Sequence, residues 1–185
     1  TRKEPLGHIL FHGPPGVGLA MLRSHYKLPS LITGGAQESG RRGGTENIPG
    51  IVGFAKAIEQ LASALPHATE QMEKLRNRLI EGVSRAAGNI VVHGQGPRIC
   101  NTAHIGFPGM DAETLLIQLD LAGVAASHGS ACSSGGLEPS PILLQMGIPP
   151  KLAASSIRFS LSRFTTQADI DQTIDLVSQL IKRSF

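Results

Sequence analysis

The stretch D-A-E-T-L-L-I-Q-L-D-L-A-G-V-A-A-S-H-G-S-A-C-S-S-G-G, residues 111–136, holds a helix, a strand and a polar loop in succession. Asp111 suits a helix N-cap, and apolar residues at helical spacing follow it. Gly123 ends the predicted helix, and residues 124–127 predict a strand. The loop after this strand carries one thiol, Cys132, among glycines and serines. Helices and strands mix in this way from residue 48 onward, which predicts an α/β or α+β protein; we expect the α/β class.

The rest of the chain alternates between the same two kinds of element. The first fifty residues are rich in glycine and proline and indicate strands joined by turns. Pro66 is expected to interrupt a long helical pattern. Apolar periodicity predicts helices at 48–65, 69–87 and 166–182, strands at 17–22, 89–92, 103–107 and 157–161, and a short helix that Ser140-Pro141 opens and Gly147 closes.

Composition excludes several classes of protein. A chain of 185 residues with 41% hydrophobic content can bury the core of one domain or slightly more. The net charge of +3 is spread along the chain, and only 4% of residues are aromatic, so nucleic-acid binding is not predicted. No apolar run approaches the roughly 20 residues of a membrane helix, and two cysteines make no disulfide framework; we expect a soluble, cytoplasmic protein. The seven histidines show no metal-ligand spacing, so no metal is predicted.

Cys132 is the strongest candidate for chemistry. Glycines at 129, 135 and 136 give its loop conformational freedom, and neighbouring serines keep it polar. A thiol reacts as the thiolate, which His128 and free backbone amides could stabilise. The alternative is a small buried cysteine in a tight turn. Cys100, between Ile99 and Asn101, is interpreted as structural.

Two further residues could bind anions. If residues 157–161 form a strand, Arg158 shares one face with Ser160 and Ser162, where a guanidinium could bind a carboxylate through two hydrogen bonds. A solvated arginine on an exposed strand is the alternative. Thr45 follows a pair of glycines whose N–H groups, with the threonine hydroxyl, could bind phosphate, although glycine-rich turns before helices are common. The turn at residues 13–18 lacks the lysine of a phosphate-binding loop and is interpreted as a turn into a strand.

Four stretches, in this order, resemble the cysteine desulfurases of the NifS/IscS type, which are class V aminotransferase-like enzymes of the fold-type-I pyridoxal-phosphate group. The stretches are F-H-G-P-P-G-V-G, G-G-A-Q-E-S-G-R-R-G-G-T-E-N-I-P-G-I-V-G, G-S-A-C-S-S-G-G-L-E-P-S and S-S-I-R-F-S-L-S-R-F-T-T. The resemblance runs from about His8 to the C-terminus and implies the C-terminal portion of such an enzyme. It implies that residues 1–50 are the end of the large cofactor domain and that residues 51–185 are the small α/β domain carrying the cysteine loop.

The resemblance also implies roles. Cys132 corresponds to the nucleophile that takes sulfur from L-cysteine as a persulfide and leaves alanine. Arg158 corresponds to the residue that binds the substrate carboxylate, and Thr45 to a ligand of the cofactor phosphate. Pyridoxal 5'-phosphate is the implied cofactor, a homodimer the implied assembly, and a sulfur-acceptor or scaffold protein for iron–sulfur cluster or thiocofactor assembly the implied partner.

One position departs from the family pattern. The family has a lysine that forms a Schiff base with the cofactor just before the glycine-proline turn, where this chain has Leu10 or, in the other alignment, Ile9. We therefore predict that this chain alone does not turn over cysteine. A non-catalytic dimerisation or sulfur-acceptor module and one half of a split enzyme are the alternatives, and a selenocysteine lyase is a weaker one.

Overall fold

The computed structural model describes residues 9–12, 16–22, 25–26, 29–128 and 139–183. The cysteine loop around Cys132 therefore lies outside the described residues. The chain forms two compact units, residues 1–65 and 66–185, each of which is described by itself. The boundary expected from the sequence was after residue 50, whereas these units divide after residue 65, inside a helix.

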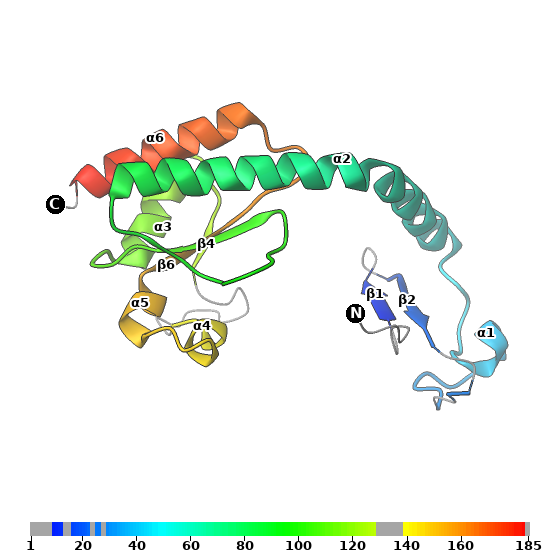
Figure 1. The fold of residues 1–185 in the computed structure, drawn as a ribbon. Helices are drawn as coiled ribbons and strands as arrows, with labels where there is room; N and C mark the ends of the chain where they lie inside the picture. The colour runs from blue at the N-terminus through cyan, green and yellow to red at the C-terminus, as the bar shows by residue number, and fades with distance from the viewer. Residues whose placement is uncertain (1–8, 13–15, 23–24, 27–28, 129–138, 184–185) are drawn as a thin grey trace. The chain divides into compact units, whose positions relative to one another are not determined.

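The first unit begins with a two-stranded antiparallel hairpin (Figure 1). Strand β1 (Ile9–His12) pairs with β2 (Gly18–Met21), so that Leu10 lies opposite Ala20. The strand expected at residues 17–22 is thus present. A short helical segment, α1 (Gln37–Gly40), follows, and its residues Glu38 and Ser39 have positive φ angles of 48° and 58°. Periodicity could not predict this segment, because left-handed residues do not continue a helix.

Helix α2 (Ile48–Ala87) is continuous over 40 residues, with Pro66 inside it. The interruption expected at Pro66 is therefore wrong. A proline removes one backbone N–H from a helix, but tertiary packing can outweigh this loss. Here the turns after the proline are well packed, since they bury Met72, Leu75, Leu79 and Val83.

The second unit contains a four-stranded sheet in the order β3-β4-β6-β5, in which every pairing is antiparallel. Three of these strands were expected at overlapping residues, while the strand expected at residues 124–127 is shorter and lies later, at residues 127–128. Their bounds are β3 (Val91–Val92), β4 (Thr102–Gly106), β5 (Ser127–His128) and β6 (Ser156–Ser160).

Three helices cover one face of this sheet, and two shorter helices lie on the other side (Figure 1). The covering helices are α2, α3 (Ala112–Leu121) and α6 (Gln167–Arg183), while α4 (Pro141–Gln145) and α5 (Pro150–Ala154) are the shorter ones. The core lies between the sheet and the three helices and includes Leu79, Val83, Ile105, Phe107, Leu115, Leu119, Ile157, Phe159 and Val177. None of the helices in the described part of the chain is long and apolar enough to cross a membrane.

The helix starts show why the sequence folds in this way. Asp111 caps α3, because its carboxylate accepts a hydrogen bond from the backbone N–H of Thr114 at 2.8 Å, which confirms the expected N-cap. At α6, Thr166 and Asp169 form a reciprocal pair: the Thr166 N–H donates to the carboxylate and the Asp169 N–H donates to the hydroxyl. Ser140 precedes α4 as expected, but its side chain makes no capping hydrogen bond.

Gly106 in β4 leaves room for contacts above the sheet. A Cβ atom at this position would lie 2.8 Å from a methyl group of Leu152 and 3.0 Å from Nε2 of His93. We expect Gly106→Ala to lower the free energy of unfolding by about 1–3 kcal/mol, because overpacking forces neighbours to shift. Chemical denaturation measures the change. Gly53→Ala is the control, since Gly53 lies in α2 with open space around it; an equal loss in both variants would contradict the steric explanation.

Candidate active site

Arg158 lies on the face of the sheet that points away from the three covering helices. Its neighbours in β6, Ile157 and Phe159, are 0% and 4% exposed in the core, whereas Arg158 is half-buried. Because successive side chains of a strand point to opposite faces, the guanidinium belongs to the other side. The alternation expected from the sequence is therefore present, and Arg158 is partly enclosed by the fold.

The strand register places Arg158 in a row of four side chains across the sheet. His104 of β4 is its partner on one side, and Ser127 of β5 is its partner on the other. His93 directly follows β3 and donates its backbone N–H to the carbonyl of His104 at 2.9 Å. Side chains at paired positions share a face, so the row runs His93, His104, Arg158, Ser127.

His104 and Arg158 form the closer kind of antiparallel pair. The two ends of this ladder are hydrogen-bonded, Leu161 N–H to Asn101 and Phe107 N–H to Ser155. Hydrogen-bonded and non-hydrogen-bonded pairs alternate, which makes the pair at 104 and 158 non-hydrogen-bonded. In such pairs the Cα atoms lie about 4.5 Å apart, so the imidazole and the guanidinium stem are immediate neighbours.

Hydrogen bonds to Ser156 fix the histidine end of the row. The Ser156 hydroxyl donates to the carbonyl of Leu152 in α5 at 2.7 Å. Its oxygen lies 2.8 Å from Nε2 of His93. Because the hydroxyl has one proton, which Leu152 receives, His93 must be the donor through Nε2–H. Nδ1 of His93 then carries a lone pair, and it is enclosed without a hydrogen-bond partner among the described residues.

Both histidines are neutral near pH 7. Burial, together with smaller effects of His93, Arg158 and His128, lowers the pKa of His104 to about 4. Burial also lowers the pKa of His93. None of the ion pairs between described residues involves Arg158. The guanidinium is therefore the charge that an anion would meet in this row.

The strand paired with Arg158 leads into the cysteine loop. His128 ends β5 and is held there, because its Nδ1 donates to the backbone carbonyl of Ser156 at 3.0 Å. Cys132 follows four residues later in the sequence and lies outside the described residues. Cys100, the other cysteine, is a half-buried free thiol just before β4.

Thr45 belongs to the first unit, and its surroundings differ from the expectation. The amides of the preceding glycines are already used: Gly43 N–H donates to Ile32 at 2.7 Å and Gly44 N–H donates to the side chain of Gln37 at 3.2 Å. Arg42 donates to the Thr45 backbone carbonyl at 3.4 Å. The glycine amides are therefore not free to bind phosphate, while Thr45 itself is exposed.

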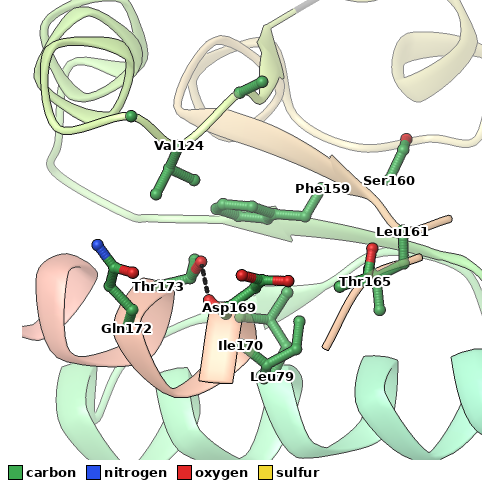
Figure 2. A pocket seen from close by; sticks show the side chains of 12 residues that line it. Leu79, Val124, Phe159, Ser160, Leu161, Thr165, Asp169, Ile170, Gln172 and Thr173 are labelled. Carbon is green, nitrogen blue, oxygen red and sulfur yellow. Dashed lines mark hydrogen bonds between the residues drawn. The ribbon is translucent and has the colours of Figure 1, made fainter. Parts of the chain in front are cut away.

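A cavity of about 260 Å³ lies on the helix side of the sheet (Figure 2). Phe159, Val124 and Leu79 form its apolar wall, and Asp169 lies at its edge. The Asp169 carboxylate accepts hydrogen bonds from the backbone N–H and the hydroxyl of Thr166, at the start of α6. Since Arg158 points to the opposite face, this cavity is separate from the row of side chains described above. No group of three metal ligands occurs within the ranges that the structure describes.

The family described as aminotransferase class-V matches residues 7–173. This chain belongs to the class-V aminotransferase family. The match spans the positions of Thr45, Cys132 and Arg158. The family implies pyridoxal phosphate as the cofactor.

Cysteine desulfurases are among the proteins to which this chain is similar. Cysteine desulfurase IscS of Clostridium botulinum is 40% identical over 176 residues, which are 94% of this chain and 44% of that protein. Cysteine desulfurase 2 of Trichormus variabilis is 43% identical over 178 residues, 96% of this chain and 44% of that protein. The chain thus spans less than half the length of these relatives. The resemblance stated from the motifs is confirmed.

Solved structures agree on the fold. A NifS-like protein is 30% identical, with a TM-score of 0.82 over 96% of this chain and 47% of that chain. A NifS-like protein from Rickettsia africae is 29% identical, with a TM-score of 0.76 over 89% of this chain and 43% of that chain. The α/β class expected from the sequence is therefore confirmed.

Among the described residues, none fits a covalent attachment of pyridoxal phosphate. Both candidate positions for the lysine, Ile9 and Leu10, lie in β1 and carry no amine. All lysines with described side chains are exposed, and two of them, Lys56 and Lys74, form ion pairs with glutamates on α2. Within the described residues, this chain offers no buried lysine for a Schiff base.

The sequence reasoning missed the histidines beside Arg158. The two histidines form no recognisable sequence motif. His93 directly follows β3, and His104 lies in the middle of β4. One signal was available in the sequence: polar and apolar residues alternate over residues 102–106, which places His104 on the face opposite the apolar side chains. Only the strand register could reveal that its neighbour is Arg158.

Proposed function

We propose that this chain is the sulfur-carrying, carboxylate-binding portion of a cysteine desulfurase. Cys132 receives sulfur that comes from L-cysteine, becomes a persulfide, and passes the sulfur to an acceptor for iron–sulfur cluster or thiocofactor assembly. Arg158 binds the α-carboxylate of the amino acid, and Thr45 contacts the cofactor phosphate. Pyridoxal phosphate held by a lysine of another chain would supply the activation of L-cysteine that leaves alanine.

One observation carries this proposal: Arg158 is paired across the sheet with the strand that leads into the cysteine loop. Ser127 lies opposite Arg158, and Cys132 is five residues further along the chain. An extended chain spans at most about 3.6 Å per residue, so the thiol is tethered within roughly 18 Å of the Ser127 backbone. A carboxylate held by Arg158 would thus lie within reach of a thiol on a short tether.

The missing lysine supports a second arrangement, in which another chain completes the reaction. Cys132 can accept sulfur without any amine in this chain, because its thiolate can attack the terminal sulfur of a persulfide on a complete desulfurase. The Cys132–sulfur bond forms, the donor's sulfur–sulfur bond breaks, and the donor leaves as a thiolate. No oxidant is needed. A sulfur-acceptor module, or one half of a split enzyme, would work in this way.

A labelling experiment tests the proposal. The full chain is incubated with a complete cysteine desulfurase and sulfur-labelled L-cysteine, and the label on each cysteine is found by mass spectrometry of peptides. We expect the label on Cys132 in the wild-type chain and in Cys100→Ser, and none in Cys132→Ser. Equal labelling of Cys100, or none on Cys132, would contradict the proposal.

A second arm uses the chain alone with pyridoxal phosphate and L-cysteine. We expect no internal aldimine in the absorption spectrum and no alanine, because neither Ile9 nor Leu10 can form an imine. Formation of an aldimine and of alanine would show that another lysine of this chain forms the Schiff base.

A selenocysteine lyase would instead act on selenocysteine and discriminate against cysteine. Size measurement in solution tests the proposed homodimer, and the proposed cytoplasmic location rests on the need to keep Cys132 reduced.

A further inference from the structure

Two buried nitrogens beside Arg158 have no partner in the structure. Nδ1 of His93 and Nε2 of His104 are enclosed and make no hydrogen bond to a described residue. Their rings meet edge to face, with centroids 5.3 Å apart and an interplanar angle of 84°. A buried nitrogen without a hydrogen bond is costly, so two of them on adjacent rings point to a hydrogen bond between these rings. Because both atoms are enclosed, a bound ligand cannot be the partner of either.

The chemistry of the two rings is complementary. His93 must carry its proton on Nε2, since that atom donates to Ser156, and its Nδ1 is therefore an acceptor. If His104 carries its proton on Nε2, each unpartnered nitrogen finds its counterpart in the neighbouring ring. Nδ1 of His104 then holds a lone pair. His104 as a residue is half-buried.

Arg158 is suited to donate a hydrogen bond to Nδ1 of His104. A guanidinium can only donate hydrogen bonds, and His104 is its close partner across the strands. A protonated His104 could not accept from Arg158, but burial and the nearby positive charges keep this ring neutral near pH 7. His128, the other titratable residue that acts on His104, is held by the Ser156 carbonyl.

We propose that His104 is a positioning residue for Arg158, at the end of a directed chain of hydrogen-bonding groups that starts at the Leu152 carbonyl of α5. In this chain Ser156 donates to Leu152, His93 donates to Ser156, His104 donates to His93, and Arg158 donates to His104. The first two links are present at 2.7 and 2.8 Å. The last two close when the guanidinium binds a carboxylate, which orients Arg158 for that ligand. This role rests on the proposed function only in assigning a carboxylate to Arg158.

Two variants of His104 separate positioning from packing. His104→Asn keeps a side-chain acceptor near the place of Nδ1, whereas His104→Leu keeps much of the volume without any acceptor. The probe is acetate, titrated into the full chain at about pH 7, and the readout is the NMR signal of the Arg158 Nε–H. Loss of one charge-assisted hydrogen bond predicts acetate binding roughly three- to tenfold weaker in His104→Leu, and within about twofold of wild type in His104→Asn. His67→Leu, on the exposed surface of α2, is the matched control.

The tautomers provide a readout that a purely structural role would not move. In the wild-type chain, nitrogen NMR should find the proton on Nε2 and a lone pair on Nδ1 in both His93 and His104. In Ser156→Ala we expect His104 to become a mixture of tautomers, while Ser156→Thr, which keeps the hydroxyl, preserves the single form. Thermal unfolding confirms that each variant is folded.

Several results would overturn the proposal. Acetate binding by His104→Leu equal to wild type, equal losses in the Asn and Leu variants, or a proton on Nδ1 of His104 would each do so. Absence of acetate binding in the wild-type chain would also do so. The labelling of Cys132 does not depend on these outcomes, because a thiolate can take sulfur from a donor persulfide whether or not Arg158 is oriented.

Discussion

Replacement of Phe159 by alanine is expected to lower the free energy of unfolding of the second unit by about 3–5 kcal/mol. Phe159 is 4% exposed and lies opposite Ala103 in the central pair of strands. Its ring also forms part of the wall of the cavity on the helix side of the sheet (Figure 2). Truncation would enlarge that cavity and remove contacts with the helices above, since protein interiors relax only partly around a lost side chain.

Denaturant unfolding of the full chain measures this loss. Phe164→Ala is the matched control, because Phe164 is 75% exposed and contacts the guanidinium of Arg163 at 4.6 Å from its ring centroid. We expect the control to change the stability by less than about 1 kcal/mol. Similar losses in the two variants would contradict the placement of Phe159 in the core.

The same substitution should also weaken acetate binding at Arg158. Phe159 and Arg158 are consecutive in β6, so the core side chain fixes the backbone that carries the guanidinium. Strand β6 therefore joins the core to the candidate site. A folded Phe159→Ala variant with weaker acetate binding and a disturbed Arg158 Nε–H signal would show this link. Unchanged binding and an unchanged signal in the folded variant would show that the two faces act independently.

Local sequence patterns were sufficient to predict the orientation and the ends of elements that bury one face. The alternation of Ile157, Phe159 and Leu161 fixed which side of β6 carries Arg158. Asp111 and Gly123 marked the two ends of α3, because a cap and a left-handed glycine depend only on nearby backbone. These features follow from a few consecutive residues, so they could be predicted from the sequence.

Features that depend on distant residues could not be predicted. Helix α2 continues through Pro66 because packing of its later turns outweighs one lost hydrogen bond. The row of His93, His104 and Arg158 brings together residues from three separate segments, and only the strand register aligns them. The glycine amides near Thr45 are used within their own loop, which composition could not reveal. Cys132 was found from its sequence motif and stays a prediction, since it lies outside the described residues.

The family and the missing lysine together limit what this chain can do. The class-V match shows which enzymes share its ancestry and fold, while Ile9 and Leu10 leave β1 without an amine. Carboxylate binding and sulfur acceptance need only a guanidinium and a thiol, and both occur here at the positions that match the family motifs. Both proposed functions are therefore chemically possible without a Schiff base in this chain.

Acidification from about pH 7 to about pH 5 is expected to destabilise the second unit by about 1–2 kcal/mol through His104. The pKa of this ring is about 4 in the folded protein and 6.5 for an ordinary histidine, because burial and the charges of His93, Arg158 and His128 oppose protonation. Between these two values the unfolded chain binds a proton that the folded chain does not. Stability is therefore full above about pH 6.5 and falls as the pH drops toward 4. His93, whose pKa is lowered by burial, adds a loss of the same sign.

Urea unfolding at the two pH values measures this effect. Most carboxylates begin to titrate below about pH 5, so this window isolates the histidines. His104→Asn removes the titrating ring, and its stability should depend on pH by about 1–2 kcal/mol less than that of the wild-type chain. His67→Asn, on the exposed surface of α2, should keep the wild-type dependence. If His104→Asn shows the full wild-type dependence, His104 is not the buried neutral ring described here, and its support of Arg158 loses its physical basis.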